Sequence, residues 1–287
     1  MIDLVIEARR RDLGGFDVGR VLPFAKHRMV GPFIFFDHMG PIEIAPERAR
    51  SADVRPHPHI GLATVTYLFA GEIVHRDSIG SHQTIRPGDL NWMTAGRGIV
   101  HSERFERARR EPEVVHGIQS WVALPDGVEE TEPAFEHVDS SALPSRESDG
   151  AVLRLIAGEA CGMRSPVRTH SPLFYLHLTL ATGAHARIDV ASPERAAYIV
   201  QGEVEVERER YAGGRMLVFQ SGAPILVKAL QPSVLMLLGG EPIGKRFVDW
   251  NFVSSSKERI EQAKAQWRAG RMKLPIGDDT EFIPLPA

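Results

Sequence analysis

Four residues in two short segments have the types and the spacing of metal ligands. His57 and His59 lie in the segment 55–59, and His101 and Glu103 lie in the segment 96–103. Residues two apart point to the same face of an extended strand, whereas a helix would need a spacing of three or four. Two facing strands could therefore aim three imidazoles and one carboxylate at a single point.

This ligand set suits a transition metal with open coordination positions. Neutral imidazoles and a carboxylate bind Fe, Mn, Co, Ni, Cu or Zn. A closed structural zinc site is not expected, because the cluster has no thiolate and Cys161 is the only cysteine. Four protein ligands on a metal that prefers octahedral geometry leave two positions for water, dioxygen or a bidentate substrate.

The segments around these residues read as short strands. Pro56 and Pro58 alternate with the two histidines and should stiffen an edge strand, because proline fixes φ and cannot donate to a ladder. Gly and Pro residues punctuate many other apolar segments, which predicts an all-β sandwich or barrel. The clearest predicted strands are 60–69, 73–76, 90–93 and 118–124.

The chain divides into two halves in this interpretation. Residues 1–125 form an N-terminal metal-binding domain, and residues 151–287 form a second domain with a C-terminal helix. The stretch 126–150 is polar and acidic, and we interpret it as a connector.

A weak internal repeat supports the two halves. The segment 67–73 resembles 198–204 at an offset of 131 residues, and a second match of turns suggests an offset of about 126. The first offset carries the two histidines of 55–59 onto apolar residues, and the second does the same for His101 and Glu103. The predicted counterparts are Ile188, Val190, Val227 and Ala229. Only the first half would then bind metal.

The C-terminal region has the pattern of an amphipathic helix. Ser255 and Glu258 have the spacing of a capping box. Ile260, Ala263 and Trp267 follow at helical spacing, with Lys264 at the edge of the apolar stripe. We expect this helix to pack on a barrel.

Bulk composition argues against several classes of partner. The net charge of −3 gives no electrostatic basis for binding nucleic acid or an anionic membrane. No apolar run approaches the roughly 18 to 20 residues of a membrane span, and the N-terminus has no signal-peptide pattern. We therefore expect a cytoplasmic protein.

Other side chains could line the same pocket. His75 and His82 could support the ligands or line the pocket, but we favour their interpretation as ordinary surface histidines, and His38 is a candidate for the cavity wall. Trp92 and Met93 fit a pocket wall or ordinary core packing equally well.

Longer stretches resemble the pirin family of the cupin superfamily. They are 55–61, 64–72, 75–78 and, most specifically, 87–103, with weaker similarity at 35–41 and 119–125. The resemblance implies a bicupin, two antiparallel β-barrels of jelly-roll type, with one divalent metal in the first barrel. The implied ligands are His57, His59, His101 and Glu103, and iron is the favoured ion, ahead of Mn, Co, Ni, Cu and Zn.

The resemblance also implies two kinds of activity. Some bacterial relatives open the ring of quercetin with dioxygen, so the first expectation is a quercetin 2,3-dioxygenase-like oxidoreductase acting on a flavonoid-like substrate. Glu103 would then be both a ligand and a general base. The alternative is a non-catalytic metal- or redox-sensing regulator that binds a transcription factor or metabolic enzyme. Ala63 stands where cupins often carry a Glu, which should change the polarity of the pocket.

Overall fold

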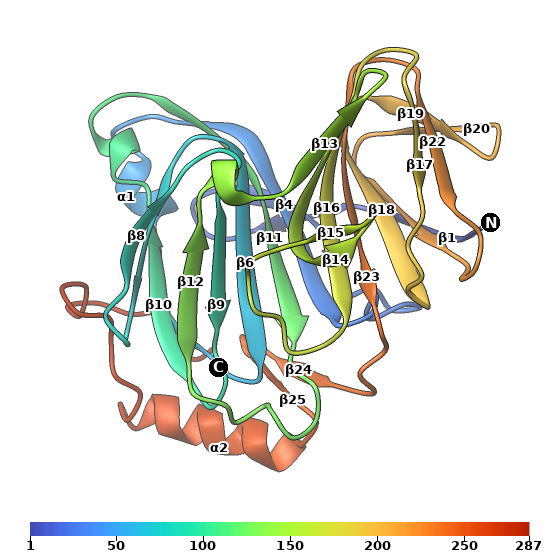
Figure 1. Cartoon of the computed structure of the whole chain (residues 1–287). Coiled ribbons are helices and arrows are strands. Elements are labelled where there is room, and N and C mark those ends of the chain that lie inside the picture. The colour runs from blue at the N-terminus through green and yellow to red at the C-terminus, as the bar shows by residue number, and fades with distance from the viewer. Residues whose placement is uncertain (287) are drawn as a thin grey trace. The chain divides into compact units, whose positions relative to one another are not determined.

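Short antiparallel strands build most of the computed structural model, which describes residues 1–286 (Figure 1). The predicted all-β class, with two antiparallel barrels and a C-terminal helix, is confirmed. Among the described residues, no helix is long and apolar enough to cross a membrane.

Each end of the chain belongs to the compact unit that is formed mainly by the other half of the sequence. Unit 1 comprises residues 1–10, 19–37 and 141–243, and unit 2 comprises 11–18, 38–140 and 244–287. The sequence-based division at 125 and 151 places the N-terminal strand with the first half and the C-terminal helix with the second. In the structure, β1 (Ile2–Glu7) instead pairs with β21 (Arg215–Phe219) of unit 1. The N-terminal strand thus pairs with the edge of a sheet built from the second half of the sequence, and the C-terminal helix packs on an apolar face built from the first half.

Unit 2 carries the predicted ligands on its smaller sheet. This sheet has the order β5-β10-β7-β8, and the larger sheet has the order β12-β9-β6-β11-β4-β3-β2. The smaller sheet consists of β5 (Val54–His59), β10 (Ile99–Arg104), β7 (Ile73–Asp77) and β8 (His82–Ile85). The larger sheet consists of β12 (Ala134–Val138), β9 (Leu90–Thr94), β6 (Leu62–Ala70), β11 (Glu113–Ala123), β4 (Phe33–Ile44), β3 (Asp17–Leu22) and β2 (Arg9–Asp12). Of the last three strands, residues 33–37, 19–22 and 9–10 belong to unit 1. Short helical turns α1 (Ala49–Ala52) and η1 (Arg107–Arg109) lie between strands.

Unit 1 has the same plan of one large and one small sheet. The large sheet has the order β1-β21-β18-β23-β16-β14-β13, with β15 paired to β14, and the small sheet has the order β17-β22-β19-β20. Their remaining bounds are β13 (Ser145–Ser148), β14 (Ala151–Ala160), β15 (Met163–Arg164), β16 (Leu173–Leu180), β17 (His185–Ile188), β18 (Glu194–Gln201), β19 (Glu203–Val206), β20 (Glu209–Ala212), β22 (Ile225–Ala229) and β23 (Ser233–Gly240).

The internal repeat is visible in the strand pairing. His57 is opposite His101 across β5 and β10, and Ile188 is opposite Ile225 across β17 and β22. The counterpart of His101 is therefore Ile225, two residues before the predicted Val227, because the offset changes between the two strands of the pair. The expected apolar character is retained, since Ile188, Ile225, Val227 and Ala229 all belong to the apolar core of unit 1.

The stretch predicted as a connector contains paired structure. Its β12 pairs with β9 in unit 2, and its β13 pairs with β14 in unit 1. A 3-10 turn, η2 (Ser140–Ala142), lies between these two strands. The polar composition of 126–150 thus fits two edge strands, one in each unit.

The C-terminal helix packs against the strands that carry the predicted ligands. α2 (Lys257–Arg268) buries Ile260, Ala263 and Trp267 in one apolar cluster with Ile60 and Val100. Those two residues directly follow His59 and precede His101, and Figure 1 shows α2 lying across one end of the unit 2 strands. Through these contacts the helix supports the backbone of the two strands that carry the histidines. The helix itself was predicted correctly.

The start of α2 differs from the expected capping box. Ser256, not Ser255, is the N-cap, and its hydroxyl accepts the backbone N–H of Arg259. The residue three positions after the cap is thus Arg259, which cannot provide the reciprocal acceptor of a capping box. Ser255 instead donates through its backbone N–H to Glu129. A short hairpin of β24 (Phe247–Asp249) and β25 (Phe252–Ser254) leads into the helix.

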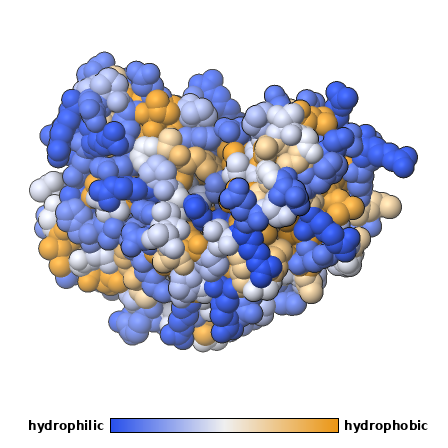
Figure 2. All heavy atoms as spheres, turned by 45° about the horizontal axis from the view of Figure 1, so that its top comes forward, coloured by the Kyte–Doolittle hydropathy of each residue, from blue (hydrophilic) through white to orange (hydrophobic). Residues whose placement is uncertain are grey.

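The surface gives no broad apolar area on the face drawn in Figure 2, where hydrophobic patches are separated by hydrophilic side chains. The exposed large hydrophobic side chains are distributed along the chain, from Met1 to Phe282. Scattered exposed apolar residues are normal for globular proteins.

Candidate metal centre

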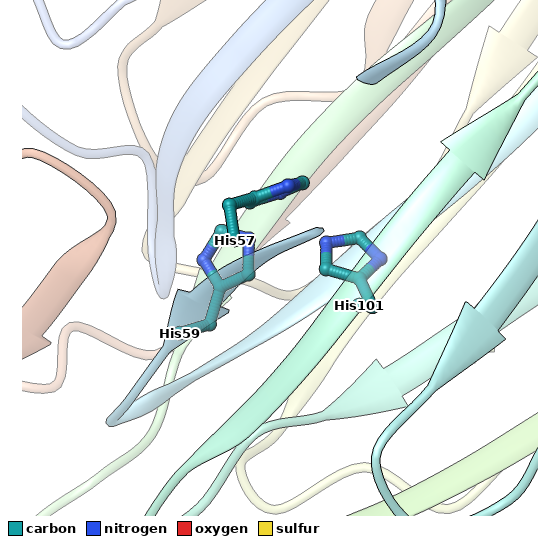
Figure 3. Close-up of side chains that lie close together, drawn as sticks. All are labelled: His57, His59 and His101. Carbon is teal, nitrogen blue, oxygen red and sulfur yellow. The ribbon is translucent and has the colours of Figure 1, made fainter. Parts of the chain in front are cut away.

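Three histidine side chains converge where β5 and β10 pair. His57 and His59 come from β5, and His101 comes from β10 directly opposite His57. The ring centroid of His101 lies 4.4 Å from that of His57 and 5.1 Å from that of His59. One ligand atom from each of the three lies within 4.8 Å of the others (Figure 3). The sequence-based expectation that these three residues lie together agrees with this geometry.

Backbone carbonyls fix which nitrogen of His57 and His59 can bind a metal. The Nδ1 of His57 donates to the carbonyl of Arg55 at 2.8 Å, and the Nδ1 of His59 donates to the carbonyl of Asn251 at 3.1 Å. Because a carbonyl only accepts, each Nδ1 carries the proton and each Nε2 keeps its lone pair. The Nε2 of His101 is buried and has no hydrogen-bond partner among residues 1–286. These three Nε2 atoms fit a metal ion.

The rings are held neutral by their surroundings. Burial lowers the pKa of His57 to about 4. Burial, with neighbouring histidines, lowers the pKa of His59 and of His101 well below the usual value. Neutral imidazole is the form that binds metal, so no proton has to be displaced near neutral pH.

Glu103 lies two residues after His101 but is not in the three-histidine group. A register shift between β10 and β5 places Glu103 opposite Val54, and on the other side of β10 the regular pairing places Glu103 opposite His75 on β7. Its Oε1 accepts a hydrogen bond from the Thr66 hydroxyl at 3.3 Å. Burial raises the pKa of Glu103 to about 7, although the bond from Thr66 acts in the opposite direction.

The larger sheet of unit 2 provides a polar and aromatic wall. The hydroxyl oxygen of Thr66 lies 3.3 Å from Oε1 of Glu103 and 2.8 Å from the side-chain amide of Gln119. Its single proton can be donated to only one of them at a time. Strand alternation places Met93 on the same face as Thr66 and directs Trp92 to the opposite face. Of the two residues expected to wall the pocket or fill the core, only Met93 therefore faces the histidines. Trp121 meets the ring of His59 edge-on, with centroids 5.2 Å apart.

Ala63 does not line this pocket. Because it is three residues before Thr66 on β6, its side chain points to the other face of the sheet. The expectation that Ala63 changes the pocket polarity is therefore wrong. Thr64, on the same face as Thr66, is the nearby position that affects this wall.

His75 is buried in the centre, contrary to its interpretation as a surface residue. Only 4% of it is exposed, and its Nδ1 lies 3.4 Å from the Nδ1 of His101. Its Nε2 lies 3.0 Å from Oδ2 of Asp77. The alternation of β7 gave a usable signal, since His75 and Asp77 have the same i, i+2 spacing as the predicted ligands. His82 is exposed as expected.

His38, expected as a candidate for the cavity wall, contacts a different histidine. Its Nε2 lies 2.8 Å from the Nε2 of His116 on β11, and the His116 ring lies against Phe69. Burial, together with His116, lowers the pKa of His38 to about 4. His38 and His116 are 78 residues apart, and no local spacing links them.

Known proteins similar to this chain were found by sequence and by structure. Residues 15–122 match the model of the Pirin family, and residues 175–273 match the Pirin C-terminal cupin domain. A pirin-like protein of Caulobacter vibrioides is 60% identical over 287 residues, covering 100% of both chains. Pirin-1 of Arabidopsis thaliana is 37% identical over 222 residues, covering 74% of this chain and 76% of the relative.

A solved structure shares nearly the whole fold. The crystal structure of a quercetin 2,3-dioxygenase from Acinetobacter baumannii superposes with a TM-score of 0.90 at 32% sequence identity. The similarity covers 99% of this chain and 95% of that one. The family models thus match both halves of the chain, and the structural similarity extends over nearly its whole length.

Proposed function

The chain belongs to the pirin family of cupin proteins, and we propose that it is a metal-dependent dioxygenase acting on a flavonol such as quercetin. The observation that carries this proposal is the buried group of His57, His59 and His101, in which every Nε2 is left available. The structural similarity to a quercetin 2,3-dioxygenase supports the choice of substrate class.

One divalent transition metal fits this group, with Glu103 as the proposed fourth ligand. Glu103 extends from the same strand as His101 and is held by Thr66 on the facing sheet. Iron is the ion we propose, because nitrogen and carboxylate donors with open positions are typical of iron oxygenase sites. When bound, the metal would favour the deprotonated form of a substrate hydroxyl and supply redox chemistry with dioxygen.

The protein side chains would orient the flavonol and handle its proton. Glu103 is the proposed acceptor of the hydroxyl proton, and the Thr66 hydroxyl holds the Oε1 atom of that carboxylate in place. Trp121 gives the pocket a flat apolar wall beside His59, which suits an aromatic ring system. Burial of the three histidines keeps bulk water from their ring nitrogens.

Aerobic turnover of quercetin by reconstituted protein tests the proposal. The protein is stripped with a chelator and reloaded separately with Fe(II), Mn(II), Co(II), Ni(II) or Cu(II). Loss of quercetin absorbance and a ring-opened product in mass spectrometry are expected with at least one ion. The His57→Ala/His101→Ala variant is the matched control and should give no product. Metal binding without product from any ion would refute the dioxygenase and favour a non-catalytic metal-sensing role.

A further inference from the structure

A buried carboxylate is linked to the third histidine of the centre through another histidine. Asp77 and His75 lie on β7, and His101 lies opposite Asp77 on β10. Asp77 is fully buried, and its Oδ1 accepts the backbone N–H groups of Ile79 and Ser81 at 3.1 and 2.9 Å. Its Oδ2 faces the Nε2 of His75 at 3.0 Å. The carboxylate is thus fixed at both oxygens.

The direction of each hydrogen bond follows from the carboxylate. Burial raises the pKa of Asp77, but hydrogen bonds from His75 and Ser81 outweigh it and leave the pKa below its usual value. An ionised carboxylate only accepts, so the Nε2 of His75 carries a proton. Because two nitrogens 3.4 Å apart can share only one proton, the Nδ1 of His75 is then assigned as the acceptor. The Nδ1 of His101, 3.4 Å away, is its hydrogen-bond partner and carries the proton between them.

We propose that Asp77 and His75 are positioning residues that set the tautomer and ring orientation of His101, leaving its Nε2 free for a metal. Backbone carbonyls hold His57 and His59 in the same tautomer, so all three rings are held through Nδ1. Carboxylates that orient metal-binding histidines raise the basicity of the ligand, and their loss typically weakens metal binding by about 10- to 100-fold.

The packing around His75 fits a fixed orientation. The ring of Phe135 stacks on the ring of His75, with centroids 4.4 Å apart and an interplanar angle of 14°. Phe135 comes from β12, in the stretch expected to be a connector. Stacking at this angle favours the ring orientation in which the two nitrogens of His75 face Asp77 and His101.

The tautomer can be tested without any metal. In histidine-¹⁵N-labelled, metal-free protein, long-range ¹H–¹⁵N spectra should show His101 with its proton on Nδ1. His75→Leu should remove that preference, whereas His75→Asn, whose Oδ1 replaces the Nδ1 acceptor, should retain it. His82→Leu, at an exposed histidine of the neighbouring strand β8, is the matched control and should change nothing.

Affinity for Zn(II), measured by chelator competition, gives the second readout. His75→Leu should bind Zn(II) about 10- to 100-fold more weakly than the wild type, and His75→Asn should recover part of the loss. The inference rests on the proposed metal centre, but the two fail differently. Wild-type protein that binds no metal would refute the centre alone. A proton on the Nε2 of His101 in the wild type, or unchanged affinity in His75→Leu, would overturn the inference.

Discussion

His57 and His101 are directly opposed across the β5–β10 pair, with their ring centroids 4.4 Å apart. Cross-strand neighbours on one face are separated by only about 4.5–5.5 Å between Cβ atoms, so this register alone brings two imidazoles into contact. The same register in unit 1 places Ile188 opposite Ile225. Equivalent strand pairs thus support a polar centre in one unit and an apolar core in the other.

Removal of either opposed histidine should abolish metal loading. His57→Ala and His101→Ala each delete one of three converging ligand atoms, so their metal affinity should fall by more than the roughly 10- to 100-fold expected for loss of an orienting residue. Elemental analysis of untagged protein after dialysis measures this. His82→Ala should retain the wild-type metal content, and equal metal in all three variants would argue against the centre.

Thr66 should affect turnover more than metal binding. Thr66→Val keeps the shape of the side chain but deletes the hydroxyl that lies between Glu103 and Gln119. Hydrogen bonds to charged groups contribute about 1.5–3 kcal/mol, so kcat/KM for quercetin should fall roughly 10- to 100-fold. Thr66→Ser, which restores the hydroxyl, should recover most of the activity. Similar losses in both variants would assign the effect to packing instead.

Acidic pH should weaken the hydrogen bonds that hold Asp278 against β10, the strand that carries His101 and Glu103. Asp278 accepts hydrogen bonds from Ser102 and Arg104, which flank Glu103 on β10. Burial raises the pKa of Asp278, but these bonds outweigh it and hold the pKa below the usual range. A lowered pKa in the folded state stabilises the protein above the unfolded-state value of about 4. That stabilisation is lost as the pH falls from about 4 through the folded-state pKa.

Urea unfolding of Asp278→Asn tests this pH dependence. The variant should be less stable than the wild type at pH 6, by about 1.5–3 kcal/mol for lost hydrogen bonds to a charged group. The difference should shrink as the pH falls below 4. Asp279→Asn, at the exposed neighbouring position, should match the wild type throughout. A difference that persisted undiminished at pH 3 would exclude Asp278 as the titrating group.

The apolar counterpart in unit 1 should matter for stability alone. Ile225→Ala removes a buried side chain from the core of that unit, which should lower the free energy of unfolding by about 2–5 kcal/mol. Metal content and quercetin turnover should remain at wild-type levels in the folded variant. Thermal unfolding and elemental analysis of the same sample separate the two effects, and reduced metal content would contradict the assignment of one centre to unit 2.

Strand periodicity predicted that the side chains of His57, His59 and His101 lie together, as they do in the structure. The i, i+2 spacing is a local property, because successive side chains of any strand alternate between faces. The same local logic predicted the apolar second half and the amphipathic stripe of α2. It did not fix the register between strands, which depends on turn lengths and bulges, and so it misplaced the counterpart of His101 by two residues.

Tertiary structure decided what surrounds each histidine. The partner of His59 is the carbonyl of Asn251, 192 residues later in the chain, and the partner of His101 is His75 on a neighbouring strand. Such contacts follow from how distant segments pack. The i, i+2 spacing of His75 and Asp77 could indicate that they share a face, but it does not specify which residue they meet. The sequence by itself determined which side chains could bind a metal. The fold decided which nitrogen each ring presents, because that depends on the acceptor packed against the other nitrogen.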